Sequence, residues 1–343
     1  MMQFTARIPA RDFGLQSERS VLGFADGSFT GPAAVPSLDA GHVFDPIVFE
    51  SIRMWWEADD GTSPLYVSGP TGCGKTSTVL QFLARVHAPV VSITCRRRMD
   101  KQDLIGAWGV DSATGKFRWY DGPASLAWRH GLVLLINEFT TAPAEVWVSA
   151  NDILEGAALT NERTGEVIPR HPNTRVIITD NCPVGCAGDA GSEYIARERQ
   201  DASVADRFWH LKVEYLARER EAAAVLHACR AAERTLGSDL LDRIVGCALD
   251  FAAASRDLAA RPMDPDAFCV PGDKAVSTRV LIRFTRSLIT LLEARKAMDE
   301  AAARRVIPDP VAKALDLTIA GGCPEKVRNT LMQLAEFCFA ALA

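Results

Sequence analysis

Residues 69–76 have the sequence Gly69-Pro70-Thr71-Gly72-Cys73-Gly74-Lys75-Thr76, a complete G-x-x-x-x-G-K-[ST] pattern. A short apolar run, residues 65–67, precedes this pattern, and an amphipathic stretch, residues 78–83, follows it. The order of strand, glycine-rich loop and helix is the context in which backbone N–H groups curl around a phosphate at the positive end of a helix. The stretch therefore predicts a site for a nucleoside triphosphate.

The functional groups of this loop have separate predicted roles. Lys75 is expected to contact the β- and γ-phosphate oxygens, and the Thr76 hydroxyl to hold Mg²⁺. The sequence has no N-K-x-D guanine motif, which disfavours a small GTPase and leaves ATP as the expected nucleotide. The residues predicted to bind it are Gly69, Pro70, Thr71, Gly72, Cys73, Gly74, Lys75, Thr76 and Ser77.

Composition sets few limits on the class of protein. The 343 residues are 48% hydrophobic, enough for two domains, and their net charge of −5 gives no general attraction to nucleic acid or acidic lipid. No apolar stretch approaches the length of a membrane span, and residues 1–7 lack the apolar core of a secretory signal. We therefore expect a cytoplasmic protein without a membrane partner, and nucleic acid is disfavoured as a partner.

The nine cysteines are an odd, scattered set, which is typical of reduced thiols. Cys182 and Cys186 form one close pair, but no second pair of Cys or His follows it. A zinc site at this pair is therefore the less favoured alternative.

Three regions differ in their pattern along the chain. Residues 1–43 contain many glycines and prolines without sustained periodicity, which predicts an irregular arm. In residues 44–216 apolar runs alternate with amphipathic stretches, which predicts an α/β domain with a central parallel sheet. Residues 217–343 have a helical pattern and predict an all-helical domain. The expected strands are 65–68, 90–94, 132–136, 176–179 and 208–213, and the expected helices include 221–226, 240–253, 278–297 and 326–342.

A second nucleotide signature follows the apolar run 132–136, which ends in Asn137-Glu138. A buried parallel strand would deliver these side chains at its carboxyl end, where open α/β sheets bind their ligands. Glu138 is then placed to orient and deprotonate the water that attacks the γ-phosphate. Asn137 occupies the usual position of a metal-linked aspartate and can hydrogen-bond a Mg²⁺-bound water, but it brings no charge. The alternative is a core strand that ends in a polar turn.

Two further polar groups stand next to apolar runs. Asp180-Asn181 follows the run 176–179, and Asp206-Arg207 precedes Phe208. Each signal is weak alone, because polar residues at strand ends are usually satisfied turns and surface charges.

Together these residues resemble the AAA+ ATPases, and within them the MoxR group, with greatest similarity to the CobS cobaltochelatase subunit and its CbbQ/NorQ relatives. The resemblance covers most of the chain. It implies a P-loop domain with a central parallel sheet followed by a helical lid. The stretches that carry it, besides the two nucleotide signatures, are 36–39, 43–46, 103–106, 121–123, 151–156 and the hairpin-like 159–168.

The resemblance also implies roles for single residues. Asn181 matches the sensor 1 residue that polarises the attacking water together with Glu138. Arg207 matches the arginine finger that contacts the nucleotide of a neighbouring subunit. Arg279, at the start of a lid helix, matches sensor 2 and would contact the γ-phosphate. Asn137 departs from the usual acidic residue, which puts the rate of hydrolysis in question more than nucleotide binding.

We therefore expect an ATPase that works as a ring, a homohexamer, and remodels a partner protein through an adaptor with a von Willebrand A domain. One alternative is a nucleotide-gated assembly module that hydrolyses ATP weakly, which Asn137 favours. Another is the ATPase subunit of a metal chelatase, which rests on the likeness to CobS alone.

Two groups of neighbouring residues each allow two interpretations. Residues 96–98 are three arginines that either face a central pore or, as the favoured alternative, lie on a solvated face. Phe117, Trp119 and Tyr120 either grip a substrate or pack against their own hairpin.

Overall fold

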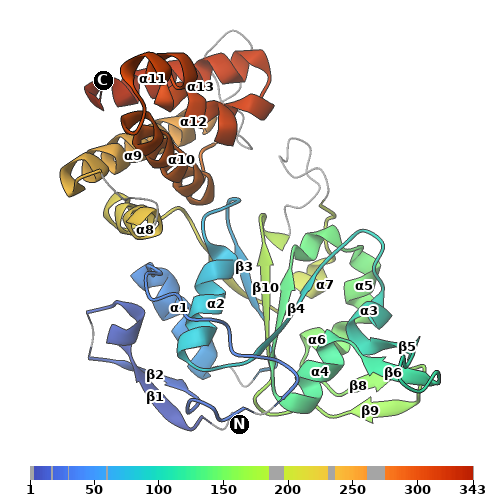
Figure 1. Ribbon diagram of the computed structural model, residues 1–343. Coiled ribbons are helices and arrows are strands. Elements are labelled where there is room, and N and C mark those ends of the chain that lie inside the picture. The colour runs from blue at the N-terminus through green and yellow to red at the C-terminus, as the bar shows by residue number, and fades with distance from the viewer. Residues whose placement is uncertain are drawn as a thin grey trace. The chain divides into compact units, whose positions relative to one another are not determined.

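The computed structural model describes residues 4–16, 18–29, 31–58, 61–184, 197–230, 236–260 and 275–342. The chain forms two compact units (Figure 1). The first comprises Met1–Gly69 and Lys75–Val213, and the second comprises Pro70–Gly74 and Glu214–Ala343. Each unit has a buried apolar core of its own.

The first unit is built on a parallel sheet with the strand order β11-β3-β10-β7-β4. All five predicted strands form, with bounds shifted by no more than one residue: β3 (Leu65–Ser68), β4 (Val90–Thr94), β7 (Val133–Asn137), β10 (Arg175–Asp180) and β11 (Trp209–Lys212). The α/β fold class with a central parallel sheet is thus confirmed. Continuous apolar runs form the three central strands because both faces of the sheet are covered.

Helices lie on both sides of this sheet. In Figure 1, α1 (Pro46–Ala58) and α2 (Lys75–Arg85) lie on one side, and α4 (Pro123–His130) and α6 (Asn151–Leu154) on the other. The unit also contains the short helices α3 (Lys101–Ile105), α5 (Ala144–Ser149) and α7 (Ala202–Ala205).

One aromatic cluster fixes the chain after β7. Phe139 opens the short 3-10 helix η2 (Phe139–Thr141) and stacks on Trp147 of α5 with 4.1 Å between ring centroids. It also meets Tyr66 of β3 and Phe208 edge-on, and its side chain is fully buried. This packing anchors the residue directly after Glu138.

Residues 1–43 contain regular structure where the sequence predicts an irregular arm. Strands β1 (Ala6–Pro9) and β2 (Ser20–Gly23) pair antiparallel, with the 3-10 helix η1 (Ala10–Phe13) between them. Phe13 packs on Phe49 of α1 and Phe82 of α2. Residues 6–9 and 20–23 form no continuous apolar run, and contacts of Phe13 and Leu22 with α1 and α2, rather than local pattern, hold this element in place.

Two hairpins project from the first unit. Strands β5 (Gly106–Val110) and β6 (Phe117–Asp121) form one, and β8 (Leu159–Asn161) and β9 (Glu166–Ile168) form the other. On the first, Phe117 is 77% exposed, whereas Trp119 packs edge-on against Trp108. The three arginines at 96–98 are exposed, and Arg96 pairs with Asp103.

The second unit is helical. The predicted helices form as α8 (Arg218–Arg230), α9 (Ser238–Ala259), α10 (Thr278–Lys296) and α13 (Glu325–Phe339). Two shorter helices, α11 (Glu300–Val306) and α12 (Pro310–Thr318), have no separate prediction because Pro308 and Pro310 interrupt the helical pattern there. Phe251, Phe284 and Phe339 meet in the core. Among the described residues, no helix is long and apolar enough to span a membrane.

A buried ion pair fixes the start of α10. Glu221 of α8 is only 3% exposed and accepts hydrogen bonds from Arg256 at 2.7 and 2.9 Å and from the Thr278 hydroxyl at 2.5 Å. The Ser277 hydroxyl accepts from the N–H of Val280 and caps the helix. These contacts tie three helices together at the residue next to Arg279.

Replacing Glu221 with Ala should lower the free energy of unfolding by about 3–5 kcal/mol, because Arg256 then stays largely buried without its carboxylate. Urea unfolding followed by circular dichroism measures this change. The matched control is Glu300→Ala, which removes an exposed pair with Arg304 in the same unit and should change the midpoint little. Equal, small shifts in both variants would contradict a structural role for the buried pair.

Candidate nucleotide site

The glycine-rich loop joins β3 to α2, which begins at Lys75. The Lys75 side chain is 7% exposed, and its Nζ donates to the carbonyl oxygen of Gly69 at 2.8 Å and to Asn181 Oδ1 at 2.9 Å. A lysine ammonium has three donors and no acceptor, so it can hold these partners or exchange them for phosphate oxygens. The lysine is thus positioned between the loop and the end of β10.

Hydroxyl and amide oxygens gather beside the loop. Asn137 Oδ1 accepts from the Thr179 hydroxyl at 2.8 Å and from the Thr76 hydroxyl at 3.5 Å. Thr179 lies here because it is the register partner of Asn137 in the parallel pair of β7 and β10. Neutral oxygen ligands of this kind suit Mg²⁺, which completes its shell with waters and phosphate oxygens. Thr76 and Asn137 therefore fit the predicted metal role, without contributing charge.

The described residues contain no group of three His, Cys, Asp or Glu side chains that could hold a metal by themselves. Cys182 is buried and contacts Asp180 and Thr140, whereas Cys186, its predicted companion, lies outside the described residues.

Glu138 lies directly after β7 with a left-handed backbone, φ 60°, and its N–H donates to the carbonyl oxygen of Thr179 at 2.8 Å. A non-glycine residue in this conformation costs on the order of 1 kcal/mol and is held in place by its surroundings. The Asn181 amide donates to Glu138 Oε2 at 3.3 Å and contacts Oε1 at 3.5 Å. The turn thus directs the carboxylate toward Asn181 and leaves it 41% exposed.

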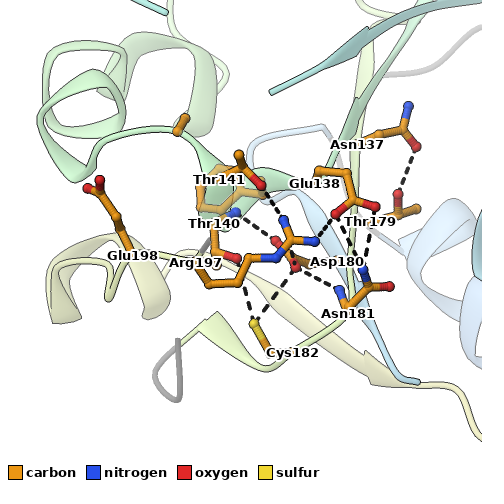
Figure 2. A network of polar contacts seen from close by, with 12 residues as sticks. Asn137, Glu138, Thr140, Thr141, Thr179, Asp180, Asn181, Cys182, Arg197 and Glu198 are labelled. Atoms are coloured by element: carbon orange, nitrogen blue, oxygen red, sulfur yellow. Dashed lines mark hydrogen bonds and ion pairs between the residues drawn. The ribbon is translucent and has the colours of Figure 1, made fainter. Parts of the chain in front are cut away.

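The structure therefore brings together five of the residues that the sequence singles out: Lys75, Thr76, Asn137, Glu138 and Asn181. They come from the start of α2, the last residue of β7, and the residues directly after β7 and β10, at the carboxyl edge of the sheet. Figure 2 shows Glu138 facing Asn181, and Asn137 turned toward Thr179. This is the edge at which parallel α/β sheets bind ligands.

Arg207 lies away from this group. It precedes β11, at the amino edge of the sheet, where the N–H of Trp209 donates to the carbonyl oxygen of Pro64. A strand of four to six residues is about 13–20 Å long, so Arg207 and Glu138 lie at opposite edges. In this chain Arg207 pairs instead with Glu155, at 2.8 Å.

Arg279 belongs to the second unit, together with the loop residues Pro70–Gly74. Its N–H donates to the carbonyl oxygen of Gly72 at 3.4 Å, and its side chain is exposed. Gly72 has φ 73°, and a Cβ there would lie 2.4 Å from Ser277 Oγ. Only glycine fits this position, because a side chain would be both strained and in collision.

Arg197 is the site residue that the sequence does not reveal. It is 9% exposed, and its guanidinium forms an ion pair with Glu138, contacts the Thr141 hydroxyl, and lies 3.7 Å from Asp180. Burial lowers the pKa of Arg197. Burial also raises the pKa of Asp180, against the lowering effect of hydrogen bonds from Thr140 and Asn181. In the sequence, Arg197 begins a run of three charged residues, 197–199, that is typical of a solvated face.

Comparison with known proteins identifies the domain that carries this site. Residues 64–208 match the family model described as AAA domain (dynein-related subfamily). The chain is 28% identical over 135 residues to Protein CbbQ of Hydrogenophilus thermoluteolus, covering 39% of this chain and 50% of that protein. It is 31% identical over 150 residues to the denitrification regulatory protein NirQ of Pseudomonas aeruginosa, covering 43% and 54%.

A further relative is the gas vesicle ATPase GvpN2 of Halobacterium salinarum, at 28% identity over 176 residues, covering 45% of this chain and 50% of that protein. The chain thus spans about half the length of the curated relatives it matches. The segment 64–208 that matches the family model contains the loop at 69–76 and the residues Asn137, Glu138 and Asn181. The chain thus contains an AAA domain, and in sequence it is similar to the proteins CbbQ, NirQ and GvpN2.

Proposed function

We propose that this chain binds ATP with Mg²⁺ and hydrolyses the nucleotide as part of a ring, in order to remodel or activate a partner protein. The observation that carries the proposal is the continuous line of contacts from Lys75 through Asn181 to Glu138. A phosphate-binding cation, a polar amide and a carboxylate within one hydrogen-bonded line are the parts that phosphoryl transfer to water needs.

The arrangement suggests how nucleotide binding prepares hydrolysis. When phosphate oxygens replace the acceptors of Lys75, the Oδ1 atom of Asn181 loses its donor. Asn181 can then orient a water toward the γ-phosphate while Glu138, 3.3 Å away, accepts the proton of that water. Thr76 and Asn137 would hold Mg²⁺, which supplies positive charge to the phosphate oxygens when it is bound.

The position of Arg207 supports action on a neighbouring subunit. Because Arg207 and Glu138 lie at opposite edges of the sheet, an arginine finger at this position serves the site of another protomer. Its present pair with Glu155 is partly exposed, and such pairs contribute about 0–1 kcal/mol, so little free energy opposes its exchange for a phosphate. A homohexamer, and an adaptor with a von Willebrand A domain as the link to the client, are the assembly we propose from the family resemblance.

One observation favours a second candidate, a nucleotide-gated assembly module with weak hydrolysis. Asn137 Oδ1 already accepts from the hydroxyls of Thr179 and Thr76, and it adds no negative charge beside the metal position. A metal-linked water would be held less firmly by this neutral amide than by a carboxylate. Binding would then control assembly more than turnover.

Lys75→Ala should reduce ATP affinity by an order of magnitude or more, because it removes a charge-assisted contact worth roughly 1.5–3 kcal/mol. Calorimetric titration measures the affinity. Lys101→Ala is the control, since Lys101 is also partly buried and paired, with Asp152, but lies outside the site. Unchanged affinity in the Lys75 variant would refute the proposed phosphate contact.

Asn137→Asp should raise steady-state hydrolysis, because it restores a charge beside the metal position. Glu138→Gln gives the lower reference, with ATP retained and turnover reduced roughly 10²–10⁴-fold. A phosphate-release assay on the three proteins measures both effects. If the wild type already hydrolyses fast and Asn137→Asp slows it, the gated alternative fails and Asn137 is part of the mechanism.

Arg207→Ala should preserve nucleotide binding and reduce turnover on the order of 10³–10⁵-fold. Mixing it with Lys75→Ala should restore activity, because an intact loop then meets an intact arginine at some junctions. The control mixture is Lys75→Ala with Glu138→Gln, in which every site keeps one defect, so no activity should return. Mass photometry establishes that mixed rings form. Full turnover by a monomeric wild type would exclude action between subunits.

A further inference from the structure

Arg197 is a buried cation at the candidate site without an assigned role. Its guanidinium lies between the carboxylates of Glu138 and Asp180 and contacts the Thr141 hydroxyl (Figure 2). Taking a guanidinium out of water costs several kcal/mol unless good partners compensate. The carboxylates of Glu138 and Asp180 supply this compensation. Arg197 is therefore part of the site and not an isolated buried charge.

The backbone next to Arg197 is held firmly to the chain that follows Glu138. The N–H of Glu198 donates to the carbonyl oxygen of Thr140 at 2.7 Å, and the Gln200 amide donates to that of Ala142 at 3.3 Å. Asp180, in turn, accepts from the Thr140 N–H at 2.6 Å. The backbone beside Arg197 is therefore hydrogen-bonded to η2 and to the residue after it, which holds Arg197 in place beside Glu138.

Glu138 needs such a support. It is partly exposed, and among the described residues its side-chain partner besides Arg197 is the Asn181 amide, at the long distances of 3.3 and 3.5 Å. A glutamate with these contacts alone samples several rotamers, whereas a general base must be held within hydrogen-bond distance of its water. The ion pair with Arg197 uses Oε2 and leaves Oε1 with only the 3.5 Å contact.

We propose that Arg197 is a positioning residue of the hydrolytic site. It fixes the Glu138 carboxylate through Oε2, so that Oε1 faces the attacking water and accepts its proton. This inference rests on the proposed function, in which Glu138 is the base. Among the described contacts, Arg197 meets the proposed catalytic residues directly at Glu138, so its expected effect on turnover passes through the position of that carboxylate.

The test is a cycle of four proteins: wild type, Arg197→Met, Glu138→Gln and the double variant. Arg197→Met keeps much of the buried volume and should retain ATP affinity within about twofold, while turnover falls about 10–100-fold, the loss expected for a misplaced catalytic group. In the double variant, turnover should equal that of Glu138→Gln, because residues acting as a unit are not additive. Arg197→Lys should recover part of the loss, since it restores the charge but not the planar fork.

The control is Arg129→Met, which removes another partly buried arginine, paired with Asp121 and Glu166 in the same unit. Arg129→Met should leave turnover near wild type. When it is combined with Glu138→Gln, the fold-loss in turnover should be the product of the two single losses. Unchanged turnover in Arg197→Met, or losses that multiply in the double variant, would overturn the inference.

Urea unfolding of the same four proteins separates this inference from the proposed function. Non-additive shifts of the midpoint are expected if Arg197 holds Glu138. A wild type without turnover, alone or with a partner, would refute hydrolysis and with it the catalytic purpose of the contact. Additive midpoint shifts would refute the contact itself, whatever the turnover.

Discussion

The parallel register of β7 against β10 is the constraint on which the site depends. It sets Asn137 beside Thr179, and so places Glu138 and Asn181, the residues that follow, at one edge of the sheet. Backbone hydrogen bonds fix this register, and a shift by one residue would turn each side chain to the opposite face. The pairing of β3 with β10 adds the third element, because β3 leads into the loop that ends at Lys75. The local sequence determines which side chains each strand carries, but the pairing of the strands determines which side chains lie next to one another.

Much of this arrangement could be predicted, because it follows from pattern. The apolar runs are long enough to indicate buried strands, and the motif at 69–76 indicates the edge that binds phosphate. Pairings between segments far apart in sequence leave no such signal. Arg197 is 59 residues after Glu138 by sequence number, in a run of charges typical of solvent-exposed chain. Strands β1 and β2 were not predicted for a related reason: aromatic contacts of Phe13, between the two strands, and hydrogen bonds of Leu22 with α1 hold this element in place.

Charge balance at the carboxyl edge is maintained without a nucleotide. Two cations, Lys75 and Arg197, and two carboxylates, Glu138 and Asp180, are connected through Asn181 and the ion pairs. In the proposed function, ATP would bring negative charge to this group, and Lys75 could turn to it because its acceptor on Asn181 is a neutral amide. Arg197 cannot turn as easily, because its partners are carboxylates and Asp180 is fully buried. The two cations therefore differ in function: one is exchangeable and the other fixed.

The neutral side chain of Asn137 has a consequence for the proposed ring. Where a carboxylate is absent beside the metal position, a larger share of the transition-state charge must be stabilised by other cations. Arg207 of a neighbouring protomer is the cation that the proposed assembly adds, and in the described chain it lies at the opposite edge of the sheet, paired with Glu155. Under the proposed function, a site with a neutral Asn137 and a distant arginine would hydrolyse ATP slowly while the subunits are apart. In the proposed ring, assembly would supply the missing charge, and turnover would then depend on the formation of the ring.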